Sequence, residues 1–350
     1  MRLLKKPNFD VGTFFTTCVN GIGSAALRAR FIKFSDKVVT ASLDYESKSS
    51  KHELYIVIDQ KLKDRKLHSP PLITKDELKK LYENQVAKKD RPGRPTYDKL
   101  LITRNKRCPF CSVGKVKNLD HFLPKAHFPI FSVTPINLVP SCRDCNQDKN
   151  DDFSVDIRKQ SLHPYFDDVS KVQWLFAKVV EESNPPVISY YTDSILVKPK
   201  KLALKVDAHF ISYNLNDIFT DLAADMLSDI YNYCMNQFNR EGKESLRLYL
   251  LEQKKSYESA HLNSWQGTMY GALANSEWYC SGKFINTQDQ KRTEPTAEVV
   301  NTCPECKGKE TINCQYCKPY QHKECTKCHG TYVMTSSECK LCKGIGVVDE

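Results

Sequence analysis

The sequence predicts an α+β protein in which at least two segments are stabilised by zinc. Twelve of the fifteen cysteines form six C-x-x-C pairs, the spacing with which two thiolates hold half of a tetrahedral zinc site. Short apolar runs near Leu119 and within residues 172–191 indicate strands. From Leu215 to Ile230 apolar residues recur every three or four positions, which indicates a helix. We therefore expect small sheets and longer helices around zinc-stabilised turns.

Length and composition limit the class of protein. At 350 residues the chain can form two or three packed units. It is 40% hydrophobic and 27% charged, with a mean hydropathy of -0.52. No run approaches the roughly 18 apolar residues that span a bilayer, and no signal peptide follows Met1. The sequence thus predicts a soluble protein without a membrane partner. Cysteines with zinc spacing, in a sequence without a secretion signal, favour the reducing cytoplasm.

The charge of the chain favours a polyanionic partner. The formal net charge is +10, and Lys and Arg gain affinity for nucleic acid by releasing its condensed counterions. Positive charge is densest in residues 88–107. The basic residues there are Lys88, Lys89, Arg91, Arg94, Lys99, Arg104, Lys106 and Arg107. The segment is suited to holding the DNA backbone, but a solvated basic loop explains it equally well.

Changes of pattern divide the chain into five regions. These are an N-terminal α+β region of unassigned role (1–104), a core that carries the chemistry (105–168), a mostly helical region that packs on it (169–284), a polar linker (285–300) and a small cysteine-rich zinc domain (301–350).

Within the first region we expect a helix from Phe14 to Phe34 and a strand from Glu53 to Asp59. Another helix should start at Thr74, where T-K-D-E offers a capping box with Glu77.

The segment from Cys108 to His163 carries the most specific pattern. It contains CPFC, then LDHFLP, then INLVPSCRDCNQDK, then HPYFD. The Asp-His pair at a strand end, the Asn-Leu-Val after a loop, and C-x-x-C-N-x-x-K opening a helix resemble the zinc-containing HNH endonucleases. Within that family they are similar to members encoded in bacterial defence systems. The resemblance covers roughly sixty residues and implies a ββα-metal fold and metal-dependent hydrolysis of phosphodiester bonds.

Zinc in this segment is expected to be structural. A helix that begins at Cys142 brings Cys145 within one turn of it. Together with Cys108 and Cys111, these thiolates fill all four positions of a zinc ion and leave none for water or phosphate.

Catalysis therefore requires a second, harder cation. The Asp120 carboxylate and the Asn146 amide oxygen are ligands that suit Mg²⁺ or Mn²⁺. His121, with an unperturbed pKa near 6.5, is predicted to take a proton from the attacking water.

Other polar residues of the segment have supporting or alternative roles. In the related nucleases the middle Asn, here Asn137, holds the metal-site loop and the general base in place. Asn146 stands where many relatives have His, which should weaken metal binding. Lys149 either contacts phosphate or faces solvent. His163 or His127 could reach the scissile phosphate, His163 being favoured because it follows the motif helix, although a lone His is more often structural.

The C-terminal region contains four more C-x-x-C units, the last of which reads CKLCKGIG. It resembles the cysteine-rich domain of DnaJ-type co-chaperones. The resemblance implies two structural zinc ions, one on Cys303, Cys306, Cys339 and Cys342, the other on Cys314, Cys317, Cys325 and Cys328. Sequential pairing into two ribbons stays open. No J-domain signature precedes the array, so we expect it to dock a protein or a nucleic acid.

Three hypotheses follow from these patterns. The first is an HNH endonuclease that cuts nucleic acid, DNA above all, in antiphage defence, with about three structural zinc ions and a catalytic Mg²⁺ or Mn²⁺. A regulatory partner such as an ATPase or a sensor would fit that role. The second is a zinc protein that binds nucleic acid without cutting it, and the third is an adaptor that recruits a partner through its C-terminal array.

Overall fold

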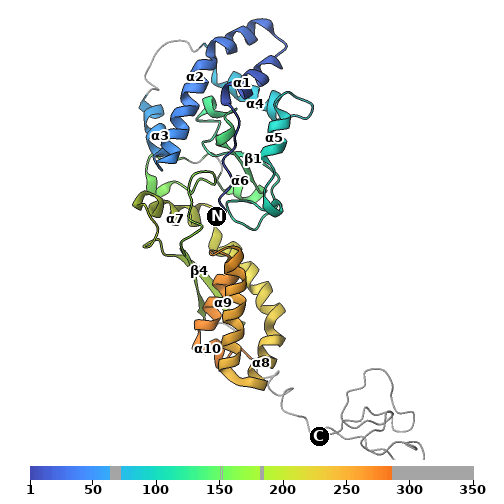
Figure 1. The fold of residues 1–350 in the computed structure, drawn as a ribbon, viewed down its shortest axis with the longest axis vertical. Helices are drawn as coiled ribbons and strands as arrows, with labels where there is room; N and C mark the ends of the chain where they lie inside the picture. Colours follow the sequence, from blue (N-terminus) through green and yellow to red (C-terminus); the bar gives the residue numbers. More distant parts are fainter. Residues whose placement is uncertain (64–71, 150, 152, 182–184, 286–350) are drawn as a thin grey trace, which may run out of the picture. The chain divides into compact units, whose positions relative to one another are not determined.

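The computed structural model describes residues 1–63, 72–149, 151, 153–181 and 185–285. The chain divides into two compact units, Met1–Phe284 and Ile285–Glu350, and the first contains every described helix and strand (Figure 1). Its α-helices are α1 Val11–Asn20, α2 Ala25–Ser50, α3 Leu54–Lys63, α4 Lys75–Tyr82, α5 Arg94–Leu100, α6 Arg143–Lys149, α7 Lys200–Ser212, α8 Leu215–Ala260, α9 Trp265–Asn275 and α10 Glu277–Cys280. Short π or 3-10 turns are η2 Glu83–Ala87, η3 Arg104–Lys106, η4 Pro129–Phe131, η5 Pro135–Asn137 and η6 Ile157–Lys159. The strands are β1 Asn118–His121, β2 Leu138–Ser141, β3 Leu175–Val180 and β4 Val187–Thr192.

The predicted helix near the N-terminus is two helices. Asp10 caps α1 and Ser24 caps α2, each accepting a hydrogen bond from a backbone amide of the first turn. The buried face of α2 continues past Phe34 through Val38 and Ser42 to Tyr45. This length matters because Tyr45 reaches the candidate site.

The strand predicted from Glu53 to Asp59 is wrong, since this segment belongs to α3. Leu54, Val57 and Ile58 are buried, and their spacing of three and four residues places them on one face of a helix. A short apolar run carries too few residues to distinguish the two periodicities.

The capping box at the start of α4 is confirmed. The Thr74 side chain accepts from the Glu77 amide at 3.2 Å, and the Glu77 carboxylate accepts from the Thr74 amide at 2.8 Å. Beyond η2, the basic segment forms the short helix α5, which has a proline in its first turn.

The region that carries the candidate site consists of β1, β2 and α6 in chain order. The strands are antiparallel, with Asp120 opposite Val139 and His121 opposite Leu138. Asp120 and His121 thus end β1, and α6 begins directly after Cys142, as the motif predicts.

A hydrophobic core joins this region to the N-terminal helices. Side chains of α1, α2 and α4 pack in one cluster with Leu119 of β1, Val133 of the connecting loop and Leu138 of β2. The N-terminal region therefore supports the strand end on which Asp120 and His121 lie.

The remaining elements of the first unit are a strand hairpin and helices. β3 and β4 pair antiparallel, which confirms the strands predicted within residues 172–191. The helix predicted from Leu215 to Ile230 is confirmed as the first part of the longer helix α8. The geometry of α8 breaks at Gly242 with φ +78°, where glycine is not strained. α9 packs along α8 (Figure 1).

Within the described residues, no helix combines the length and apolar character needed to cross a membrane.

Candidate metal centre and catalytic site

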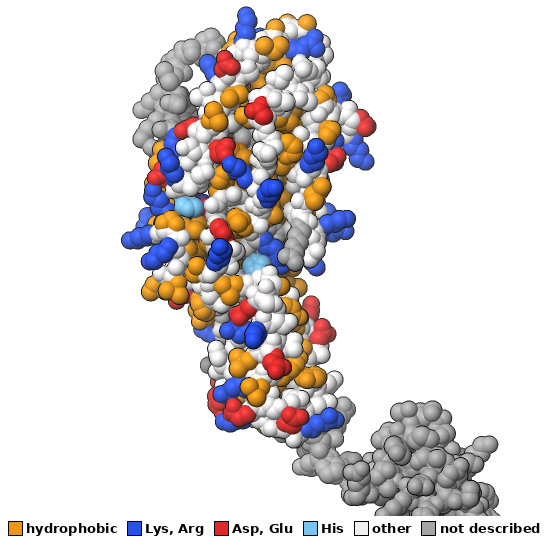
Figure 2. Space-filling model, in the orientation of Figure 1, with side chains coloured by type: hydrophobic (Ala, Val, Ile, Leu, Met, Phe, Trp, Pro, Cys, Tyr) orange, Lys and Arg blue, Asp and Glu red, His pale blue; other side chains and the backbone are white. Residues whose placement is uncertain are grey.

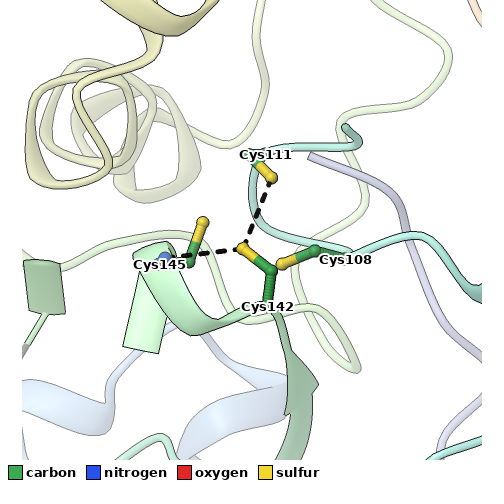
Figure 3. Close-up of side chains that lie close together, drawn as sticks. All are labelled: Cys108, Cys111, Cys142 and Cys145. Atoms are coloured by element: carbon green, nitrogen blue, oxygen red, sulfur yellow. Dashed lines mark hydrogen bonds between the residues drawn. The ribbon is translucent and has the colours of Figure 1, made fainter. Parts of the chain in front are cut away.

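Four buried thiols converge between two segments of the chain. Cys108 and Cys111 lie before β1, and Cys142 and Cys145 lie at the start of α6 (Figure 3). Their Sγ atoms all lie within 4.8 Å of one another, and those of Cys111 and Cys142 are 3.9 Å apart. Zn–S bonds of about 2.3 Å place tetrahedral sulfur ligands about 3.8 Å apart. The cluster therefore fits a metal ion such as zinc, as predicted.

Hydrogen bonds to the sulfur atoms make the four thiols of the cluster unequal. The Gly114 amide donates to Cys111 Sγ at 3.2 Å, and the Cys145 amide donates to Cys142 Sγ at 3.5 Å. Hydrogen bonding from Cys108 and other neighbouring thiols, with the Gly114 amide, lowers the pKa of the Cys111 thiol. A Cβ atom at position 114 would lie 2.7 Å from Cys142 Sγ, so only glycine fits this turn. Hydrogen bonding with Cys108 and Cys111 instead raises the pKa of the Cys142 and Cys145 thiols, so without a metal the cluster holds thiolates and thiols together.

Asp120 presents a buried carboxylate that the protein satisfies incompletely. The residue is 8% exposed, and Lys149 Nζ lies 3.3 Å from its Oδ2. Apart from this ammonium group, no donor within the described residues reaches that oxygen. Burial raises the pKa of Asp120, and the Lys149 ammonium opposes this rise. A buried oxygen with spare acceptor capacity suits a hard cation such as Mg²⁺ or Mn²⁺.

His121 is held as one tautomer. Its Nε2 lies 3.0 Å from the carbonyl oxygen of Ser132, which can only accept, so the ring hydrogen is on Nε2 and Nδ1 keeps its lone pair. The ring packs edge-on against Tyr82, with centroids 4.4 Å apart. Burial lowers the pKa of His121 to about 3. The imidazole is therefore neutral at cell pH, as a proton acceptor must be, although only 7% of the residue is exposed.

Asn137 fastens the loop between β1 and β2. Its Nδ2 donates to the carbonyl oxygens of Leu123 at 3.1 Å and Phe131 at 3.2 Å. Its Oδ1 accepts from the Leu123 amide at 2.7 Å and from the Tyr45 hydroxyl at 3.1 Å. Such a fully bonded, buried amide is what the predicted orienting role requires.

His163 does not reach a substrate, so its placement among the catalytic candidates is corrected. The residue is 1% exposed, and its Nδ1 accepts from the Tyr165 amide at 3.2 Å. The hydrogen is then on Nε2, which donates to the Tyr45 hydroxyl at 3.0 Å. Because Tyr45 in turn donates to Asn137, His163 supports the loop through Tyr45. Both ring nitrogens are occupied inside the protein.

The helix α6 brings Lys149 into contact with the strand end. Lys149 Nζ donates to the His121 carbonyl oxygen at 2.8 Å and lies beside Asp120, and the residue is 8% exposed. Of the two alternatives given for Lys149, the one in which it faces solvent is therefore wrong. Asn146, one turn earlier on the same helix, is partly buried, and no hydrogen bond of its side chain occurs among the described residues. Its position fits a ligand that approaches from solvent.

The site also contains groups that the motif does not indicate. Tyr45 comes from α2, 92 residues before Asn137, and Ser132 contributes only its carbonyl group. Nothing in the sequence around either residue marks it, whereas the buried pairing of Lys149 could have been inferred from its position one turn after Asn146. His127 lies partly exposed at the edge of the loop, with its ring 4.6 Å from that of Phe153.

The basic segment is exposed, and its charge is partly neutralised. Arg94 donates to Asp98 at 2.8 Å and to the Ala87 carbonyl at 2.6 Å, whereas Lys89 and Arg91 point outward. On the face drawn in Figure 2, basic side chains are interspersed with acidic ones. Both interpretations of the segment fit this arrangement, and only binding measurements separate them. The eight cysteines of the C-terminal array, and the two zinc sites predicted for them, lie outside the described residues.

The fold is α+β, and a buried four-cysteine cluster that could hold a metal ion joins the start of α6 to a turn before β1. Over 303 aligned residues the chain is 33% identical to Protein ea31 of Escherichia phage lambda, an alignment that covers 81% of this chain and 100% of that protein. The chain therefore belongs to the family of Protein ea31, whose name states no activity. No family model matches the chain, and no solved structure matches it.

Proposed function

We propose that this chain is a metal-dependent HNH endonuclease that hydrolyses phosphodiester bonds in nucleic acid, with DNA as the preferred substrate. One observation carries the proposal. At the end of β1, a buried carboxylate whose Oδ2 has only the Lys149 ammonium as a partner stands next to an imidazole whose tautomer leaves Nδ1 as an acceptor. A zinc site that served only to stabilise the fold would need neither group.

Each residue has a distinct task in this proposal. Asp120 and Asn146 would hold one Mg²⁺ or Mn²⁺, which when bound neutralises charge on the phosphoryl oxygens. His121 Nδ1 takes the proton of the attacking water. Asn137 keeps the loop, and with it the Ser132 carbonyl that orients His121, in place. Lys149 adds a fixed positive charge where the phosphate binds.

The biological setting rests on resemblance alone. The similarity to nucleases of bacterial defence systems supports a role in antiphage defence, and such enzymes are commonly restrained by a partner such as an ATPase or a sensor. We include that role and that partner in the proposal.

Cleavage of supercoiled plasmid by the full, zinc-loaded chain with Mg²⁺ or Mn²⁺ tests the proposal. His121→Ala should slow cleavage by a factor on the order of 10²–10⁴, because the general base is lost. Asp120→Asn should do the same, and both variants should keep their zinc content. His261→Ala is the matched control, since it removes a partly buried imidazole outside the candidate site and should cut normally. Cleavage by His121→Ala at the rate of the unaltered protein would refute the proposed chemistry.

A second candidate function has one observation in its favour. The Lys149 ammonium already supplies a positive charge beside Asp120, so the residues can also be read as a structural ion pair in a zinc protein that binds nucleic acid. That alternative predicts salt-sensitive binding and no cleavage with any divalent ion. The same plasmid experiment, with a binding measurement added, separates the two.

A further inference from the structure

The segment that leads from the end of α5 to the start of β1 is positively charged throughout (Figure 1). We call residues 99–117 the basic lobe. The lobe contains no Asp or Glu, and its basic residues are Lys99, Arg104, Lys106, Arg107, Lys115 and Lys117. Arg94, just before the lobe, is paired with Asp98. In the part of the chain that the structure describes, no carboxylate forms an ion pair with the exposed side chains of Lys99, Lys106, Arg107, Lys115 and Lys117. This charge therefore faces solvent without a counter-charge from the protein, which suits a polyanion.

The lobe also presents one apolar side chain to solvent. Ile102 is 78% exposed, more than any other large apolar side chain among the described residues. Its amide donates to the Lys99 carbonyl oxygen at 3.2 Å, and the Lys106 amide donates to the Thr103 carbonyl oxygen at 3.1 Å. Ile102 thus lies in a hydrogen-bonded turn between two lysines. A single exposed isoleucine needs no functional explanation, but an apolar side chain among unpaired cations can reach past the phosphates of a nucleic acid to the faces of its bases.

The backbone around Ile102 is held in a fixed conformation. Asn105 and Lys106 have φ values of +58° and +54°, a left-handed conformation that is unfavourable for residues other than glycine. Directly after the turn, the Cys108 amide donates to the Gly114 carbonyl oxygen at 2.8 Å, in the knuckle that supplies half of the cysteine cluster. Unfavourable backbone conformations persist where the surrounding structure enforces them, and they cluster at ligand-binding sites.

The lobe ends close to the candidate site. Lys117 directly precedes β1, and its amide donates to the carbonyl oxygen of Ser141 in β2 at 2.9 Å. Asp120 lies three residues further along the strand, a distance of about 10 Å. Neighbouring base pairs of a duplex are about 3.4 Å apart, so about three of them span this distance. One duplex can therefore contact both the lobe and the candidate site.

We propose that the basic lobe binds duplex DNA and that Ile102 inserts as an apolar wedge between two neighbouring base pairs, while the lysines beside it contact the flanking phosphates. Apolar wedges of this kind part a base step and kink the duplex. The inference takes its partner, nucleic acid, from the proposed function and adds the way in which the duplex is held. The wedge acts on the shape of the duplex and not on the chemistry of cleavage, so the two can be tested separately.

The test uses the full, zinc-loaded chain carrying His121→Ala, which should bind DNA without cutting it. A DNA duplex of about 20 base pairs with a fluorophore at each end reports binding by anisotropy and bending by energy transfer between its ends. Added to this background, Ile102→Ala should remove the bend and weaken binding about tenfold, because burial of an isoleucine side chain supplies at least that much affinity. The dependence of affinity on salt should not change, since no charge is lost.

Two further variants separate the wedge from the charge. Lys106→Asn removes a positive charge and introduces a residue that tolerates the left-handed conformation. It should keep the bend and lower the slope of log affinity against log salt concentration by about one. Ile195→Ala is the matched control, because Ile195 is 76% exposed and lies outside the lobe, with its amide bonded to the Asp193 carboxylate. It should change neither quantity.

If Ile102→Ala binds and bends the duplex as Ile195→Ala does, the inference is wrong, even where the chain with His121 intact cuts plasmid. Failure of the protein to bind the duplex would overturn it as well. A bend that depends on Ile102, in a chain that never cuts with His121 intact, would instead refute the nuclease proposal and support the wedge.

Discussion

The environment of His163 gives a quantitative prediction about stability in acid. Its imidazole is 1% exposed, and burial lowers its pKa to about 3, although the nearby Asp167 carboxylate opposes this effect. The unfolded chain binds a proton on this residue as the pH falls through about 6.5, whereas the folded protein does not. The stability that the neutral ring contributes is therefore fully present above a pH of about 6.5. It is lost progressively as the pH falls from there to about 3. Between pH 7 and pH 5, this single group should cost about 2 kcal/mol of unfolding free energy.

The assay is urea denaturation of the zinc-loaded protein at pH 7 and pH 5, comparing the unaltered chain with His163→Gln. Glutamine at this position cannot bind a proton. Acidification from pH 7 to pH 5 should therefore lower the unfolding free energy of the variant by about 2 kcal/mol less than that of the unaltered chain. Acid also weakens zinc binding, but this contribution cancels in the comparison because the cysteine cluster is the same in both proteins.

Phe122→Leu is the matched control for this measurement. Its ring packs against that of His163 with centroids 4.0 Å apart, so the substitution loosens the same site without removing a titrating group. It should lower stability at both pH values and keep the full pH dependence. If His163→Gln loses as much stability on acidification as the unaltered protein does, the ring titrates normally in the folded state. That result would mean that solvent and substrate can reach His163.

Three further predictions concern the metal centre and its supports. Cys142→Ser leaves three thiolates, so the protein should lose one equivalent of zinc in a metal-content assay; unchanged content would show that these sulfurs hold no ion. Tyr45→Phe removes the hydroxyl that links Asn137 to His163 and should cost about 1–3 kcal/mol in urea denaturation, whereas a loss under about 0.5 kcal/mol would contradict the linkage. Lys149→Met leaves the buried Asp120 carboxylate without its counter-charge and should cost about 3–5 kcal/mol. Mg²⁺ should then raise the melting temperature of this variant more than that of the unaltered chain, and equal shifts would argue against an ion at Asp120.

The features that could be predicted from the sequence depend on short-range signals. A C-x-x-C pair holds its geometry within one turn, the box of Thr74 and Glu77 spans four residues, and the hairpin of β3 and β4 is marked by SNPP between two apolar runs. The Asp-His pair ends a strand for the same reason, because alternation stops where Pro124 follows closely. Each of these signals is contained in a few neighbouring residues.

The features that could not be predicted depend on contacts between distant segments. Tyr45 bonds to Asn137 and His163, which lie 92 and 118 residues away along the chain, so no local pattern connects them. The HPYFD motif also depends on a contact with a distant segment. Its Asp167 is fully buried, accepts from the His163 amide at 2.6 Å, and forms an ion pair with Lys205 of α7. A charge buried in this way is tolerated because a partner from another element neutralises it, and a single sequence does not reveal that partner.

The C-terminal cysteine array is the part of the chain whose contribution is easiest to separate. The described core, the cysteine cluster and the loop that Asn137 fastens are all built from the unit Met1–Phe284. A chain ending at Ile285 should therefore fold, keep the zinc of this cluster and cut nucleic acid as the full chain does, with zinc content lowered by the ions of the array. If the array instead recruits a partner, pull-down from host extract should lose that partner while cleavage by the purified protein is unchanged. Loss of both cleavage and the zinc bound by Cys108, Cys111, Cys142 and Cys145 would show that the first unit depends on the second, contrary to the division that the contacts indicate.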